Sequence, residues 1–202
     1  MVQSRRLSWW IAMGYALCWA VFLLLAGGSF VRIPAALISA LWLWPARHHL
    51  SFGAWTALSV VGGIFAATVG QGFALLLLDP LSFSTRASSI GYPILREIAF
   101  GLTFGAIQGY ALRGLCSDAY PFWVGANVVA WSAYGAIGAV GTYLYVSGTV
   151  DAIETIGAFI LLAAPVPGII LGLALKRVIE VHPPADGAIE ETPEVPSGVA
   201  SV

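Results

Sequence analysis

The stretch "REIAFGLTFGAIQGYALR", residues 96–113, places glycine at every fourth position inside an apolar run and keeps its charges at the two ends. On a helix of about 3.6 residues per turn, one stripe carries Glu97, Gly101, Gly105, Gln108 and Leu112, and Gly109 is a further predicted packing position. Missing side chains let a neighbouring backbone approach closely, and close packing of this kind drives helix association in lipid. The stretch therefore predicts a helix that docks on another helix within a membrane.

The composition of the whole chain also indicates that lipid surrounds most of it. Of the 202 residues, 59% are hydrophobic and 9% are charged, whereas a soluble domain carries about 25% charged residues. The 8 Trp, 7 Tyr and 10 Phe suit an aromatic belt at the membrane–water interfaces. A net charge of −1 gives no basic field for nucleic acid. We expect an all-α integral membrane bundle in the inner (plasma) membrane, with the lipid bilayer as its first partner.

Apolar runs set the expected number of spans, because about 30 Å of hydrocarbon takes roughly 20 helical residues. Four runs are long enough: 9–26, 53–78, 122–150 and 155–175. The run 33–46 is short, and 87–112 carries Arg96 and Glu97 near its expected outer end. We predict about six helices, with five and a re-entrant segment as the alternative. Each expected pair of helices begins near an aromatic residue on the inner side and returns to a basic residue there, which suggests three repeated hairpins.

The basic residues set the expected orientation, because Lys and Arg collect in cytoplasmic loops. Six crossings with the N-terminus inside place most of them inside: Arg5, Arg6, Arg47, Arg113, Lys176 and Arg177. Both termini are then cytoplasmic. We expect a bundle over residues 1–180 and a flexible, acidic, Pro-rich tail over 181–202. The first apolar run is longer than the roughly 7 to 15 residues of a signal peptide, which favours a retained anchor.

Other helices carry small residues at helical spacing. The predicted packing positions outside the opening stretch are Gly63, Ala67, Gly70, Gly138, Gly168 and Gly172, and Ala12, Ala16 and Ala20 form a ridge in the first helix. Such positions allow close helix contact in lipid. Pro165 and Pro167 predict a kink in the last helix.

Polar side chains within the spans leave two interpretations open. The set consists of Glu97, Gln108, Asn127, Tyr134 and Gln71. In the favoured interpretation they form helix-to-helix hydrogen bonds, with Arg96 and Glu97 as anchors at the outer rim. In the other they line a polar cavity that opens outward, with Arg96 or Arg32 attracting an anion. Ionisable residues within a membrane are functional candidates by default.

Catalytic and metal-binding patterns do not emerge from the sequence. His48, His49 and His182 fall in an expected loop and in the tail, without the ligand spacing of a metal site. Cys18 and Cys116 have no partner pattern either, and the familiar catalytic motifs are missing. We expect no enzyme activity, no metal and no cofactor.

Part of the chain resembles a known group of proteins. The runs "GAIQGYALRG", "FWVGANVVAWSAYGAIG" and "PGIILGLALKR" within residues 96–177 resemble uncharacterised bacterial polytopic membrane proteins that repeat Gly-x-x-x-Gly-x-x-Gln-x-x-x-Leu-Arg. The second copy here, with Gly168, Gly172 and Lys176, lacks the glutamine. This group carries no activity to transfer. "LWLWPARHHLSFGAW" is similar to part of the membrane sensor domains that precede signalling enzymes.

Three functions remain open. The favoured one is a non-catalytic accessory or scaffolding subunit that packs against other integral membrane subunits. The second is a small-solute binding or transport protein similar to the substrate-binding subunits of energy-coupling-factor transporters, whose docking motif the alanine ridge resembles. This second function leaves a small-molecule ligand open. The third is a sensor input module acting through a separate partner.

Overall fold

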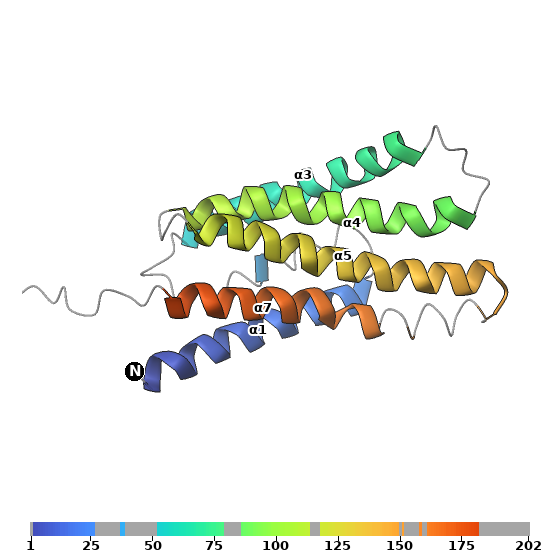
Figure 1. Cartoon of the computed structure of the whole chain (residues 1–202). Helices are drawn as coiled ribbons and strands as arrows, with labels where there is room; N and C mark the ends of the chain where they lie inside the picture. The colour runs from blue at the N-terminus through green and yellow to red at the C-terminus, as the bar shows by residue number, and fades with distance from the viewer. Residues whose placement is uncertain are drawn as a thin grey trace, which may run out of the picture.

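The computed structural model describes residues 2–26, 37–38, 52–78, 86–113, 118–149, 151, 158 and 161–181. All regular structure in these residues is helical. The helices are α1 (Val2–Ala26), α3 (Phe52–Leu78), α4 (Arg86–Gly109), the 3-10 turn η4 (Tyr110–Leu112), α5 (Ala119–Val146) and α7 (Pro165–Val181). They lie side by side in an elongated bundle (Figure 1).

Four described helices are long and apolar enough to cross a membrane: Phe52–Leu76, Ile90–Leu112, Ala119–Val146 and Leu161–Val181. A shorter apolar helix, Trp9–Val21, lies within α1. The expected class, an all-helical membrane bundle, is confirmed, but the described residues show fewer spans than the six predicted. Segment 33–46 lies outside them except for residues 37–38, and so does the tail beyond Val181.

The last span is interrupted beside Pro165 and Pro167, as predicted. Residues 161–163 are helical, the chain turns at Ala164, and both prolines occupy the first turn of α7, which then continues to Val181. Proline is tolerated in a first turn, where the missing N–H has no helical partner. Another proline, Pro93, lies inside α4.

The helices pack in a fixed order. α4 lies between α3 and α5, and α7 lies between α5 and α1. Figure 1 shows the first turn of α1, the end of α7 and the start of α5 at the same end of the bundle. The ring of Trp9 in α1 contacts Lys176 in α7, which agrees with this arrangement.

Aromatic side chains from four helices form the centre of the bundle. Fully buried rings come from α1 (Tyr15, Trp19), α3 (Trp55), α4 (Phe100, Phe104) and α5 (Trp123, Trp131). Trp19 lies edge-on to Trp131 and to Phe104, with ring centroids 5.4 Å and 6.1 Å apart. The expectation that the aromatic residues mark membrane interfaces therefore holds for only part of them, because many fill the core. The exposed aromatic side chains near the ends of the described helices include Trp9, Trp10, Tyr110, Phe122, Tyr143 and Tyr145.

The outward faces are apolar, as a lipid-facing surface requires. Large exposed hydrophobic side chains include Phe65 and Leu76 in α3, Leu102 in α4 and Val129 in α5. Hydroxyl groups on the helices bond back to the carbonyl four residues earlier, as Thr56 does to Phe52 and Thr142 to Gly138. Local bonds of this kind satisfy polar groups where water is missing.

Candidate functional site at the α4–α5 interface

The small-residue stripe of α4 lies directly against α5. A Cβ atom at Gly101 would lie 2.7 Å from the backbone oxygen of Asn127, and one at Gly105 would lie 2.7 Å from the Cβ of Asn127. Real Cβ atoms do not approach that closely, so only glycine fits at both positions. At Gly109 the Cβ would lie 3.1 Å from the Trp123 ring. The predicted docking stripe therefore faces a neighbouring helix.

Gln108 joins three helices through its amide group. Its Nε2 donates to the Ser59 hydroxyl of α3 at 2.7 Å, and its Oε1 accepts from Trp123 Nε1 of α5 at 3.1 Å. Ser59 in turn donates to the Trp55 carbonyl at 2.7 Å. All three side chains are fully buried. The result is a continuous hydrogen-bonded chain in a dry interior.

Replacing Gln108 with leucine should cost about 1 kcal/mol of stability, since an interhelical hydrogen bond in a membrane averages about 0.6 kcal/mol. Ser59→Ala, which removes one of the two bonds, should cost about half as much. Unfolding in mixed micelles, titrated with a denaturing detergent, measures both. A larger loss for Ser59→Ala than for Gln108→Leu would contradict the hydrogen-bonded chain.

Glu97 lies on the same stripe, deeper in the bundle than expected. Its carboxylate accepts two hydrogen bonds from the Arg96 guanidinium, at 2.7 Å and 3.1 Å. The Glu97 side chain is fully buried, and that of Arg96 is 31% exposed. Glu97 lies about 10 Å inside the apolar span Ile90–Leu112. The span bounds follow from helix length and composition, so the position of this pair at the outer rim stays a prediction.

Glycine also makes room for Glu97. A Cβ at Gly135 of α5 would lie 2.9 Å from the Cβ of Glu97. The contact row thus runs in steps of four on both helices, through Glu97, Gly101 and Gly105 on α4. Rows of this spacing are the i±4 ridges of helix packing. They bring Gly135, which the sequence analysis did not single out, into the interface.

The other predicted polar residues lie apart from the three grooves that the described residues line. Asn127 is buried against Gly105, and its Nδ2 donates to the Trp123 carbonyl at 3.0 Å. Tyr134 is half-buried, with its ring 5.9 Å from that of Trp131. Gln71 is exposed on α3. The three grooves described in the structure have apolar linings that contain none of the predicted polar residues.

Of the predicted packing positions on α3 and α5, some lie against a neighbouring helix, whereas one has no such contact among the described residues. On α3, Gly63 and Gly70 are buried and Ala67 is partly buried; a Cβ at Gly70 would lie 2.8 Å from the Arg96 carbonyl oxygen. Among the described residues, no atom lies within 4 Å of a Cβ at Gly138, so its packing role stays a prediction. The contact row on α5 advances in steps of four through Asn127, Trp131 and Gly135. Its next position is Ala139 and not Gly138.

α7 packs on α1 in the same way as α4 packs on α5. Gly168 and Gly172 of α7 lie against the backbone carbonyls of Ala16 and Ala12. One turn later, Lys176 lies over the Trp9 ring at 4.5 Å, as Arg113 lies over the Tyr120 ring at 4.4 Å. The alanine ridge is therefore covered within the chain. Both glycine runs dock their helix and end on a basic residue over an aromatic ring.

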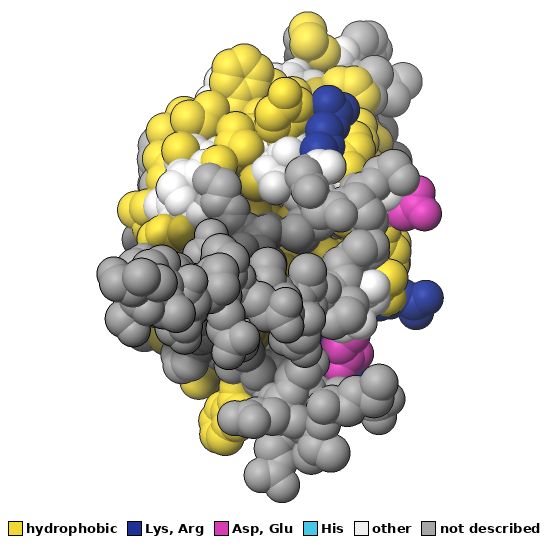
Figure 2. All heavy atoms as spheres, turned by 90° about the vertical axis from the view of Figure 1, so that its left-hand side faces the viewer, with side chains coloured by type: hydrophobic (Ala, Val, Ile, Leu, Met, Phe, Trp, Pro, Cys, Tyr) yellow, Lys and Arg dark blue, Asp and Glu magenta, His cyan; other side chains and the backbone are white. Residues whose placement is uncertain are grey.

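Basic and aromatic side chains gather at one end of the bundle. Arg113 contacts Tyr110 and Tyr120, Lys176 contacts Trp9, and Arg177 contacts Phe122. Figure 2 looks onto this end and shows Lys or Arg and Asp or Glu side chains beside hydrophobic ones. Rings that meet cations in this way are typical of a membrane–water interface.

The comparisons with known proteins are negative. No family model, curated protein or solved structure matches the chain. Within the described residues, no three His, Cys, Asp or Glu side chains lie close enough together to hold a metal ion.

Proposed function

We propose that the chain is a multi-pass protein of the inner membrane that performs no catalysis and acts as an accessory or scaffolding subunit of a larger membrane complex. The observation that carries this proposal is the engagement of Gln108. Its amide binds Ser59 and Trp123 within a packed aromatic core. Solute sites need polar groups that converge on a cavity. In the described bundle, the polar groups serve helix packing, and the large apolar surface is left for contact with other membrane components.

Purification into nanodiscs directly from the membrane, followed by mass measurement, tests this proposal. We expect a particle in which the chain forms a stoichiometric complex with a larger membrane protein. The α4 stripe that contains Gly101 and Gly105 should contribute nothing to the interface with the larger protein, because α5 already covers this stripe. A lone chain that carries a stoichiometric water-soluble solute would contradict the proposal.

The basic and aromatic end supports a cytoplasmic orientation for that end, and with it six crossings and two cytoplasmic termini. A green fluorescent protein fused after Val202 should be fluorescent, and alkaline phosphatase fused at the same place should be inactive. Fusions after Gly148, at the opposite end of α5, should show the reverse. High phosphatase activity at the C-terminus would overturn the orientation.

A second function, solute binding of the energy-coupling-factor type, rests on the Arg96–Glu97 pair. Paired charges within a membrane often mark substrate or ion sites, and this pair lies well inside the span. The docking ridge that such subunits present is covered here by α7, which favours the accessory role. Loss of a bound solute in Glu97→Gln, with the fold retained, would establish the second function. The sensor role stays a prediction, since most of the stretch behind it lies outside the described residues.

A further inference from the structure

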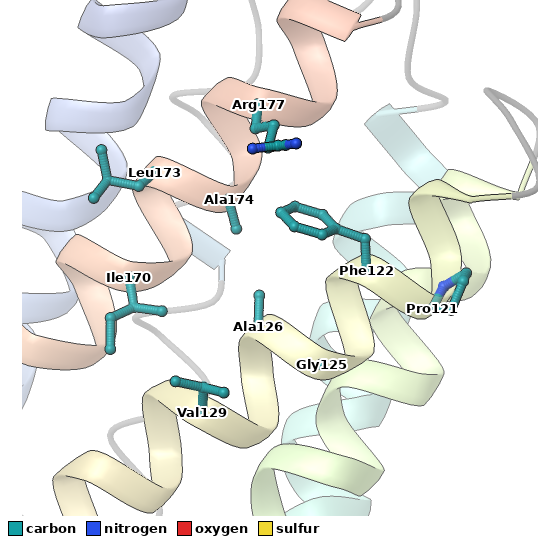
Figure 3. Close-up of a pocket in the computed structure, with 9 residues that line it drawn as sticks. All are labelled: Pro121, Phe122, Gly125, Ala126, Val129, Ile170, Leu173, Ala174 and Arg177. Atoms are coloured by element: carbon teal, nitrogen blue, oxygen red, sulfur yellow. The ribbon is translucent and has the colours of Figure 1, made fainter.

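An open groove of about 650 Å³ runs between α5 and α7. Figure 3 shows its lining: Pro121, Phe122, Gly125, Ala126 and Val129 from α5, and Ile170, Leu173, Ala174 and Arg177 from α7. Every one of these residues is apolar except Arg177, which lies at the end with the basic and aromatic side chains. The groove is therefore amphipathic along its length.

Arg177 differs from its neighbour in how its charge is engaged. Lys176 bonds to the Glu180 carboxylate at 2.8 Å. The Arg177 guanidinium lies 5.8 Å from the Phe122 ring centroid, and no carboxylate of the described chain forms a salt bridge with it. Figure 3 shows the guanidinium beside Phe122 at the mouth of the groove. A cation in this position is available to an anion from outside the chain.

We propose that the groove binds one acyl chain of an anionic phospholipid, with the lipid phosphate at Arg177. Arg binds phosphate through charge-assisted hydrogen bonds, and basic pockets between membrane helices bind anionic headgroups. From Phe122 to Val129 the groove descends about 10 Å, about a third of the roughly 30 Å hydrocarbon core. The phosphate is thus at the interface and the chain in the apolar region.

The shape of the groove favours an acyl chain over a helix of another protein. Its rim is formed by exposed, bulky side chains, namely Phe122, Val129 and Leu173, whereas Ala126 and Ala174 between them are less exposed. Helices approach each other in lipid where small residues line the contact surface. An open apolar groove with bulky side chains at its edge fits an alkyl chain. This inference stands independently of the accessory role.

Native mass spectrometry of the purified full chain tests the headgroup contact, with phosphatidylglycerol and phosphatidylcholine of the same acyl chains as probes. We expect tighter binding of phosphatidylglycerol, and about fivefold weaker binding of it to Arg177→Gln. The matched control is Arg113→Gln, which removes a charge at the same end but over Tyr110 and Tyr120. Equal losses in both variants would overturn the site.

A second pair of variants tests the acyl slot. No atom of the described residues lies within 4 Å of a Cβ at Gly125 or at Gly138, so the described helices leave room for phenylalanine at both. Gly125→Phe fills the groove and should reduce binding of both lipids at least tenfold, whereas Gly138→Phe, outside the groove, should not. Unchanged binding in Gly125→Phe would overturn the proposal. So would a photo-crosslinker at Val129 that labels a protein in the native membrane and no lipid.

Discussion

Gly105→Leu is expected to destabilise the bundle by about 3 kcal/mol, the upper part of the range for overpacked sites. A Cβ at this position would lie 2.7 Å from the Asn127 Cβ and 3.2 Å from the Val124 Cα. Neither atom can move without shifting the α5 backbone. Detergent-titrated unfolding of the full chain in mixed micelles measures the loss.

Gly138→Leu is the matched control, because it places the same side chain on α5 at a position where no atom of the described part of the chain lies within 4 Å of the Cβ. Its stability should stay within about 0.5 kcal/mol of the native chain. Gln108→Leu should fall between the two, since it removes hydrogen bonds without forcing the helices apart. Equal tolerance of leucine at Gly105 and Gly138 would contradict close packing of α4 on α5.

Arg96→Leu is expected to cost about 3 kcal/mol, because removing one partner of a buried ion pair is strongly destabilising. The Glu97 carboxylate then loses both hydrogen bonds from the Arg96 guanidinium, while its side chain stays fully buried. Glu97→Leu should cost less, because Arg96 is partly exposed and can extend toward the interface.

The double variant Arg96→Leu, Glu97→Leu separates pairing from simple burial. Its cost should be smaller than the sum of the single costs by more than about 1 kcal/mol, as expected for residues in direct contact. The four chains of this cycle are compared in the same micelle assay. Additive costs would show that the two charges do not stabilise each other.

The sequence predicts the α4 contact surface well, because glycine spacing reports directly on how close two helices come. Gly101, Gly105 and Gln108 each lie against a neighbouring helix. The spacing does not give the rotation of the partner helix. A straight stripe on α5 passes through Gly138, whereas two crossing helices touch along steps of four that pass through Gly135.

The full burial of Glu97 between the helices was not predicted, for a different reason. Charged residues near the end of an apolar run are usually placed at the interface, where they stay hydrated. Here the two charges neutralise each other within the span. Adjacent residues on a helix do not face each other, so the sequence gives little sign that they pair.

The partners of Gln108 were missed, although a signal for one of them exists. Residues equally distant from the turn of a helical hairpin lie opposite each other, and Ser59 and Gln108 are nearly equidistant from the connection 79–85. If this register is used to pair the polar residues of the two helices, it predicts the hydrogen bond between Gln108 and Ser59. The buried tryptophans carry no such signal, because Trp is common both in cores and at interfaces.

Disulfide formation between α4 and α5 tests most directly whether the small-residue stripe faces a helix. In a chain with Cys18 and Cys116 replaced by serine, Gly101→Cys should cross-link to Trp131→Cys. The two Cβ positions lie 3.1 Å apart in the native packing, and the small outward shift of α5 that a Cβ at Gly101 requires brings them toward the roughly 3.5 to 4.5 Å of a disulfide. Leu102→Cys, whose native side chain is 53% exposed on the outer face, should not cross-link to Trp131→Cys. Cross-linking from Leu102 with none from Gly101 would mean that the glycines face lipid, and the proposed packing would be wrong.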